Sequence, residues 1–364
     1  MNVLLSDICS IFKGKQINGS ELLENGKYCY LNGGINPSGY WNEYNVNENT
    51  ISISEGGNSC GYVNYNNEKF WCGAHCYYLS DLKVNTKYLY YNLKYNEKKI
   101  MNLRTGACMP NIKKSDISKF EICIENDSEK QKEIVNKLET LSNLILEKNS
   151  QIENLEKLKL SEYSKLFENE EEFDELGNLC SIKARIGWQG LTKKEYLDEG
   201  DYYLVTGVDF ADGLIDFKNC HYVTKDRFDQ DTNIQLKDGD VLVTKDGTIG
   251  KVAMVKNLDK PATLNSGVFV VRPLTNKVNN IYLEYSLKSY RFSNFIEKIK
   301  TGATISHLNQ GAFLKYKIPV PSIEKQNKFV EIISNINDLI NEYSSDLINL
   351  NNLFNSVASK YFEQ

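Results

Sequence analysis

The 364-residue sequence contains no apolar run as long as a membrane span, and Met1 is not followed by a signal peptide. Its nine cysteines are an odd number and follow no spacing typical of a disulfide scaffold. These absences predict a cytoplasmic protein with reduced thiols and no contact with a membrane. The hydrophobic content of 41% is ordinary, so we expect a folded chain with two or three domains rather than disorder.

Motifs that would carry catalysis are also absent from the sequence. No phosphate-binding Gly-Lys-Ser/Thr loop occurs, which excludes a motor driven by ATP. A DNA methyltransferase needs an Asn/Asp-Pro-Pro-aromatic tetrapeptide, and the nearest stretch, residues 36–40, lacks the second proline. His221 and His307 have no carboxylate or cysteine partner at a catalytic spacing, so each is better explained as a solvated or hydrogen-bonded side chain. We therefore predict no catalytic residue and no cofactor in this chain.

Glycine and proline are missing altogether from residues 324–362. Apolar residues recur there in steps that alternate between four and three, as they do along the seam of a coiled coil. They are Phe329, Ile333, Ile336, Ile340, Tyr343, Leu347, Leu350, Phe354, Val357 and Tyr361. The same register runs from Ile134 to Leu166 and weakens toward its far end. The pattern predicts two long helices, 129–168 and 324–362, that pack antiparallel through these stripes.

The rest of the chain repeats as well. Residues 5–11 match residues 176–182, and residues 51–57 match residues 241–247. The offset between matching stretches drifts through small insertions, as expected after a duplication. We therefore predict two units in tandem, each a globular domain followed by a long helix.

The fold class predicted for the globular domains is α+β, because short strands broken by Gly and Asp turns precede a stretch with helical spacing. In the second domain the expected strands are 202–205, 240–244, 251–255 and 267–271, and the helical stretch is 280–299. The expected segments of the whole chain are 1–125 and 171–322 for the two domains, and 126–170 and 323–364 for the two helices.

The duplication bears on a group of metal-ligand types in the first domain, Cys60, Cys72, His75 and Cys76. The matching stretch of the second domain, 263–268, contains neither cysteine nor histidine. A structural metal that one half of a duplicated chain does without is not expected. We predict no metal site, with zinc at these four residues as the alternative.

The net charge of −5 argues at first against binding to nucleic acid. However, residues 126–170 and 323–364 each carry −3, whereas residues 1–125 carry +1 and residues 171–322 carry 0. The acidity therefore lies in the predicted helices, and the charge balance of each globular domain allows a local basic face.

Residues 183–190 combine cations with an aromatic and an amide in a glycine-punctuated loop. Arg185 and Gln189 could bond base edges in the major groove of DNA, with Trp188 beside them. A surface loop with Trp188 tucked into the core explains the same pattern.

Residues 245–251 form a second glycine-rich stretch, with Lys245, Thr248 and Lys251 as candidate contacts. Because this stretch lies between two predicted strands, a hairpin turn is the simpler interpretation. The alternative is a loop against the DNA backbone, where glycine allows close approach and lysine meets phosphate. The remaining DNA-contact candidates are His307 and Asn309 in the second domain, and Asn58, Ser59, Arg104, Asn111 and Lys113 in the first.

At the level of motifs, the sequence resembles the DNA specificity subunit of type I restriction–modification systems over its full length. The resemblance rests on Ile318–Gln326 before the last helix, on Thr301–Thr304 upstream of it, and on the two-fold unit. Residues 264–267 and the 245–251 loop are similar to one common variety of target recognition domain. The first unit departs from the pattern, because Asp127 and Ser128 replace the proline pair before the helix.

The resemblance implies that each globular domain is a target recognition domain that reads half of a gapped target in double-stranded DNA. The two helices would form the spacer. Two modification subunits, which hold S-adenosylmethionine and methylate adenine, would dock on this chain, and restriction subunits could join the complex. The alternatives are a coiled-coil structural or interaction protein without DNA binding, and the specificity arm of a fused restriction–modification enzyme.

Overall fold

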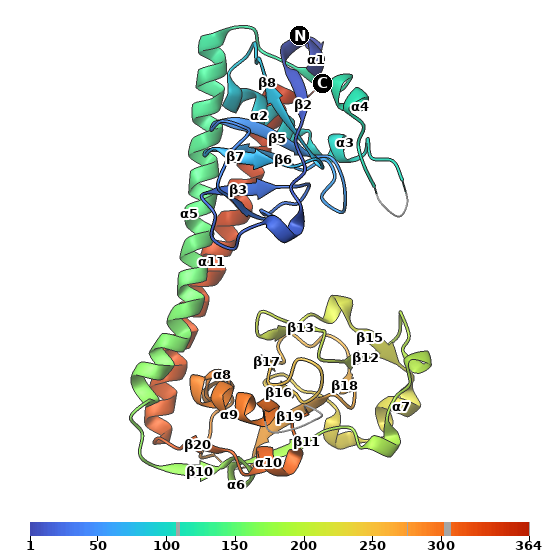
Figure 1. Ribbon diagram of the computed structural model, residues 1–364. Helices are drawn as coiled ribbons and strands as arrows, with labels where there is room; N and C mark the ends of the chain where they lie inside the picture. Colours follow the sequence, from blue (N-terminus) through green and yellow to red (C-terminus); the bar gives the residue numbers. More distant parts are fainter. Residues whose placement is uncertain (107–109, 275, 302–306, 364) are drawn as a thin grey trace. The chain divides into compact units, whose positions relative to one another are not determined.

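The computed structural model describes residues 1–106, 110–274, 276–301 and 307–363 (Figure 1). It divides into two compact units, Met1–Ser150 with Tyr343–Gln364, and Gln151–Glu342. Each unit joins one globular domain to parts of both long helices, so this division falls within the helices rather than at their ends. Within the described ranges, no helix is long and apolar enough to cross a lipid bilayer.

The first unit is built on a four-stranded antiparallel sheet. Its order is β2 (Ser10–Lys13), β8 (Cys76–Ser80), β5 (Thr50–Ser54) and β6 (Val63–Asn66). A smaller sheet places β3 (Tyr28–Leu31) between an antiparallel β4 (Gly39–Trp41) and a parallel β7 (Phe70–Cys72). The termini of the domain meet where β1 (Asn2–Leu4) pairs with β9 (Glu121–Cys123). Its short helices are α1 (Leu5–Ile8), α2 (Thr86–Tyr95), α3 (Glu97–Met101) and α4 (Lys114–Ser118).

The second unit repeats this plan in a larger form. Its main sheet has the order β11 (Cys180–Lys183), β19 (Val268–Pro273), β16 (Val241–Thr244), β17 (Val252–Met254), β14 (Leu214–Ile215) and β13 (Phe210–Ala211). Its smaller sheet places β12 (Tyr202–Val205) between an antiparallel β15 (His221–Val223) and a parallel β18 (Ala262–Leu264). The termini again meet in a two-stranded ribbon, β10 (Phe173–Glu175) with β20 (Lys317–Pro319). The shared strand order and pairing confirm both the duplication and the α+β class.

Within its described residues, the second unit has five short α-helices, and the one helical stretch predicted in its domain, 280–299, is found as two of them. The five are α6 (Leu176–Leu179), α7 (Lys225–Asp229), α8 (Asn280–Lys288), α9 (Tyr290–Thr301) and α10 (Gln310–Leu314). The stretch expected to be one helix is broken at Ser289, whose backbone is extended (φ −68°, ψ 159°). The Ser289 hydroxyl donates to the carbonyl of Ser286 at 2.6 Å, a local bond that competes with helix continuation.

Alternation along β16 shows how the main sheet of this unit is covered. Val241 and Val243 pack with residues of α8 and α9, whereas Leu242 packs with residues of the smaller sheet on the other face. Both faces of the sheet are therefore buried, and the site-forming loops extend from its strand ends.

The two long helices are α5 (Ser128–Phe167) and α11 (Ile323–Phe362), which lie side by side in each unit (Figure 1). In the first unit, Leu138 near the start of α5 shares a core with Phe362 at the end of α11. In the second unit, Phe167 at the end of α5 meets Phe329 near the start of α11, with ring centroids 5.4 Å apart. The beginning of each helix thus meets the end of the other, which confirms antiparallel packing.

A lysine in the seam of α5 explains part of the weaker register of the first helix. Lys148 lies with its ammonium 3.9 Å from the ring centroid of Tyr343 and 3.1 Å from a carboxylate oxygen of Asp346. A charged side chain at a seam position is tolerated here because both its stem and its charge find partners on α11.

Candidate nucleic-acid interface

A groove of about 690 Å³ opens in the second unit where several loops of the globular domain meet. Its lining comes from the segment 193–196, the β16–β17 loop, the β12–β13 turn, the start of β15 and the β18–β19 connection. The lining residues are Lys193, Tyr196, Thr206, Gly207, Val208, His221, Asp246, Gly247, Thr248, Lys251, Asn265 and Gly267. Loops that converge on one rigid sheet are the usual place for recognition.

Two rings in this groove are held against each other. The ring centroids of Tyr196 and His221 are 5.4 Å apart, with their planes inclined by 56°. The amide of Asn265 donates to the Tyr196 hydroxyl at 3.3 Å and accepts from the backbone N–H of Gly267 at 2.7 Å. An aromatic surface fixed in this way can contact the faces and edges of nucleic-acid bases.

Val208 projects from the β12–β13 turn with 88% of its surface exposed. The turn is held from beneath, because the carboxylate of Asp209 accepts from the backbone N–H and the hydroxyl of Thr206 at 2.7 and 2.8 Å. Burial raises the pKa of Asp209, and the two bonds from Thr206 oppose that shift. An apolar side chain presented by a fixed turn at a polar groove is suited to contact with a thymine methyl group.

The 245–251 stretch is a hairpin turn between β16 and β17, as the simpler interpretation held. The hydroxyl of Thr244 accepts from the backbone N–H of Lys251 at 2.9 Å and donates to the carbonyl of Thr248. Gly250 has a φ of +84°, and a Cβ there would lie 2.8 Å from Ile296. The turn leaves the side chains of Thr248 and Lys251 exposed at the groove, so it also fits the DNA-backbone alternative.

Lys245 is less available than Lys251. Its side chain is 22% exposed, and its ammonium lies 3.1 Å from the carboxylate of Asp246. The backbone N–H of Leu308 donates to the Lys245 carbonyl at 2.9 Å, which brings the exposed His307 next to the hairpin. Asn309 is exposed too, although its side-chain oxygen caps α10.

Arg185 lies inside the domain, with 2% of its surface exposed. Its guanidinium donates to the carbonyl of Leu264 at 2.8 Å, to the hydroxyl of Thr263 at 3.2 Å and to the amide oxygen of Gln230 at 3.3 Å. Burial lowers the pKa of Arg185, and the neighbouring Arg227 adds to that shift. These bonds join three separate segments, so the side chain acts as a structural tie.

Gln189 is also buried, at 7% exposure, and within the described chain its side-chain oxygen has no hydrogen-bond donor. The structure therefore corrects the expectation that Arg185 and Gln189 are presented to base edges. The reason is that the loop folds back over β18 rather than outward. The side chain of Trp188 lies outside the described part of the chain.

In the first unit, the structure brings the candidate residues together. The backbone N–H of Gly57 donates to the carbonyl of Pro110 at 3.0 Å, and Asn111 forms β-bridges with both Gly56 and Thr105. The β5–β6 turn therefore lies beside the described parts of the next candidate segment, residues 104–106 and 110–113. This turn is the counterpart of the hairpin in the second unit. The side chains on these two segments are exposed at Asn58, Arg104, Asn111 and Lys113, and half-buried at Ser59.

Among the described residues, no group of three or more His, Cys, Asp or Glu side chains is placed to hold a metal ion. Cys72 and Cys76 are buried, and the Cys72 thiol lies 3.4 Å from the Cys76 carbonyl. The hydrogen bond with Cys76 and burial both raise the pKa of Cys72.

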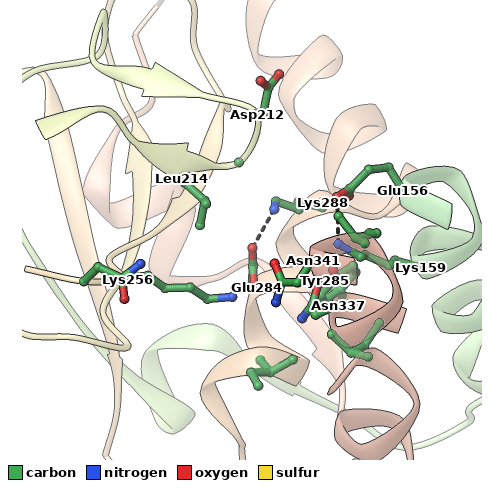
Figure 2. A pocket seen from close by; sticks show the side chains of 15 residues that line it. Glu156, Lys159, Asp212, Leu214, Lys256, Glu284, Tyr285, Lys288, Asn337 and Asn341 are labelled. Atoms are coloured by element: carbon green, nitrogen blue, oxygen red, sulfur yellow. Dashed lines mark hydrogen bonds and ion pairs between the residues drawn. The ribbon is translucent and has the colours of Figure 1, made fainter. Parts of the chain in front are cut away.

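A second cavity in this unit differs from the groove in its charge (Figure 2). It lies among α5, α8, α11 and the β13–β14 turn, and two of its three lysines form ion pairs with glutamates of the same cavity. Lys288 pairs with Glu284 at 2.5 Å and Lys159 with Glu156 at 2.9 Å, and the side chains of Glu284 and Lys159 are 7% and 8% exposed. Such a cavity does not attract a phosphate backbone, so the groove is the better candidate interface.

Several groove residues were not among the candidates chosen from sequence. Tyr196 and Val208 lie in stretches without a motif, and His221 was considered only as a catalyst. The signal available was weak: Asn265 lies within the 264–267 stretch that resembles a recognition domain. The order of the strands decides which loops meet at one groove, and this order cannot be predicted from short stretches of sequence.

Comparison with known proteins decides the family. Residues 1–157 and 169–350 match the type I restriction modification DNA specificity domain. The chain belongs to this family. It is 25% identical over 375 residues to a putative type I specificity subunit of Mycoplasma genitalium, with 98% of this chain and 92% of that protein covered. A putative type I specificity subunit of Mycoplasma pneumoniae is 34% identical over 212 residues, which are 57% of this chain and 56% of that relative.

Solved structures agree with this assignment at the level of fold. The crystal structure of a type I restriction–modification S subunit from M. genitalium matches with a TM-score of 0.58 and 23% identity, covering 100% of this chain and 96% of that one. A chain from a structure on complex assembly of the type I R-M system matches with the same TM-score of 0.58 at 14% identity, covering 99% of this chain and 97% of that one. The family that the motifs resembled is thus confirmed, and each globular domain is a target recognition domain.

Proposed function

We propose that this specificity subunit binds a bipartite, gapped target in double-stranded DNA, with each target recognition domain reading one half. The observation that carries the proposal is the duplication, because the family match covers both halves and the strand order repeats. Two readers in one chain serve two half-sites, as the two copies of a dimer do. Since the two domains differ in sequence, the two half-sites should differ as well.

The groove of the second domain supports this proposal by its chemistry. Lys193 and Lys251 supply positive charge for phosphates, and Tyr196 with His221 supplies a ring surface for bases. Val208 supplies an apolar contact that distinguishes thymine from cytosine in the major groove.

The chemistry would reside in other subunits. Two modification subunits, which hold S-adenosylmethionine and methylate adenine, would assemble on this chain, and restriction subunits would join them. This chain would supply no catalytic residue, and the assembly would work in the cytoplasm. Incubating the purified chain alone with labelled S-adenosylmethionine and target DNA should transfer no label, whereas addition of the modification subunit should restore transfer.

The test of the function is methylome sequencing of cells with and without this chain, beside a restriction-deficient modification subunit. We expect a methylated gapped motif that depends on the chain. Exchange of residues 175–322 for another recognition domain should change one half of that motif and leave the other intact. A chain that binds no duplex in a gel shift, with or without the modification subunit, would instead be an interaction protein.

A further inference from the structure

The first turn of each long helix contains a buried glutamine whose side-chain amide both donates and accepts hydrogen bonds within its own unit. Gln326 is 0% exposed and Gln131 is 4% exposed. The side-chain oxygen of Gln326 accepts from the backbone N–H of Asn279 at 2.9 Å, and its nitrogen donates to the carbonyls of Lys277 at 2.7 Å and Pro321 at 2.9 Å. The amide of Gln326 therefore joins the stretch before α8, residues 277–279, to Pro321 just before α11.

The first unit repeats this arrangement. The side-chain oxygen of Gln131 accepts from the backbone N–H of Asn85 at 2.9 Å, and its nitrogen donates to the carbonyl of Glu125 at 2.7 Å. Asn85 and Asn279 are the N-cap residues of α2 and α8, whose side chains accept from the first turns of those helices. In both units the glutamine thus joins the first turn of a long helix to the start of a recognition-domain helix.

A buried tyrosine adds a second link one turn further along the same recognition-domain helix. The hydroxyl of Tyr282 donates to the carbonyl of Pro319 at 2.8 Å, and the hydroxyl of Tyr88 accepts from the backbone N–H of Glu125 at 2.8 Å. Both tyrosines are 0% exposed. We refer to the glutamine and tyrosine of each unit, with the backbone groups that they bind, as the glutamine joint.

The hydrogen bonds of the joint restrict the angle between a recognition domain and its long helix more than apolar packing does. Packed apolar side chains tolerate small rotations of one helix on another, whereas a buried hydrogen bond is weakened steeply by misalignment and has no water to replace it. The joint is also retained where the flanking sequences differ, with Asn126 and Asp127 in one unit and Pro321 and Ser322 at the matching positions of the other. The same bonds therefore form in both units and do not depend on the residues that precede the helix.

We propose that Gln131 and Gln326 are positioning residues that set the angle between each recognition domain and its long helix, and through that angle the spacing of the DNA half-sites. The inference rests on the proposed function. The two glutamines would determine how strictly the complex requires one gap length. The grooves would determine which bases are read in each half-site.

The test uses the full chain with its modification subunit and the variant Gln326→Met, which keeps the volume and removes all three bonds. Methylation is measured on duplexes that carry both half-sites at the native gap and at gaps one base pair shorter and longer. We expect unchanged half-sites, with methylation at the wrong gaps rising roughly fivefold to tenfold relative to the native gap, as fits the loss of about one net hydrogen bond. The matched control is Val241→Ala, because Val241 is fully buried in the core of the same unit. This change should lower the melting temperature, and methylation should still require the native gap.

Tyr282→Phe is the milder second variant, because it removes one bond and keeps the packing. Strict gaps in both joint variants, with a lower melting temperature like that of the control, would show a purely structural role and overturn the inference. Loss of all DNA binding by a folded variant would overturn it too, because a positioning residue leaves half-site reading intact. If the unaltered chain supports no gapped methylation, the proposed function fails instead, so the two failures are distinguishable.

Discussion

Two cations of the second recognition domain lie in opposite environments, although they look alike in sequence. Arg185 and Lys251 both lie in glycine-punctuated loops, yet Arg185 is 2% exposed and Lys251 stands at the groove. The difference arises from partners distant in sequence, since Arg185 binds residues near positions 230 and 264. A charged residue beside glycine is normally at the surface, so the sequence alone favoured the wrong environment for Arg185.

The first prediction concerns Arg185→Met. This change leaves the buried carbonyl of Leu264 and the hydroxyl of Thr263 without their donor, so we expect a loss of about 2–4 kcal/mol in the free energy of unfolding. Denaturant unfolding of the full chain measures it. If the variant is as stable as the parent and its methylated motif becomes degenerate at one base pair of the half-site, Arg185 reads that base after all.

The second prediction concerns Lys251→Met, which is the matched exposed change. Stability should stay within about 0.5 kcal/mol of the parent. Binding of the assembled complex to every duplex should weaken by roughly fivefold, and the slope of log affinity against log salt should fall by about one, as for loss of a phosphate contact. A salt titration of binding provides the measurement. An unchanged slope would place the DNA backbone elsewhere.

At the scale of elements, the long helices were the most predictable part of the fold. The expected helices, 129–168 and 324–362, end within one residue of α5 and α11. Both stretches lack glycine and proline and keep one seam phase over more than thirty positions, which outweighs local preferences. The break between α8 and α9 was missed for the same reason. Apolar spacing continues across Ser289, and only its backbone shows the interruption.

The third prediction tests the seam between these helices. The best seam position for this test is Ile333, which is 2% exposed in the core of the second unit. Ile340, two positions further along the seam, is less suitable because it is half-buried and lines the cavity drawn in Figure 2. Ile333→Asp buries an unpaired carboxylate, and we expect a cost of about 3–5 kcal/mol in the free energy of unfolding. Ile348→Asp is the control on the same helix, since Ile348 is 63% exposed and should tolerate the change. Equal melting temperatures for the two variants would refute the assignment of the seam.

At the scale of the whole molecule, the chain is a duplication whose two halves share their helices. The last turn of α11 completes the core of the first recognition domain, where the rings of Phe362 and Tyr88 lie 5.4 Å apart. The repeat could be found from sequence because the same motifs recur in the same order, at an offset that drifts only through small insertions. The sequence did not predict that each unit contains parts of both helices. The expected division gave each helix a segment of its own, 126–170 and 323–364.

The fourth prediction asks whether helix length sets the gap in the DNA target. Each long helix contributes to the cores of both units, so shortening both helices by one heptad keeps the seam in phase. The heptads to remove are 143–149 and 344–350, which face each other because Lys148 pairs with Asp346. Each deletion shortens its helix by about 10 Å, so the preferred gap should shrink by about three base pairs.

Both half-site sequences should stay the same in this double deletion, because the recognition domains are untouched. Bending of the DNA can absorb part of the change at a cost of a few kcal/mol, so a shift of about two to three base pairs counts as agreement. Methylome sequencing gives the gap and the half-sites in one measurement. Removal of only one of the two heptads is the control, since it leaves the facing helix unmatched and should abolish methylation. An active double deletion with an unchanged gap would show that the domains, rather than the helices, determine the spacing.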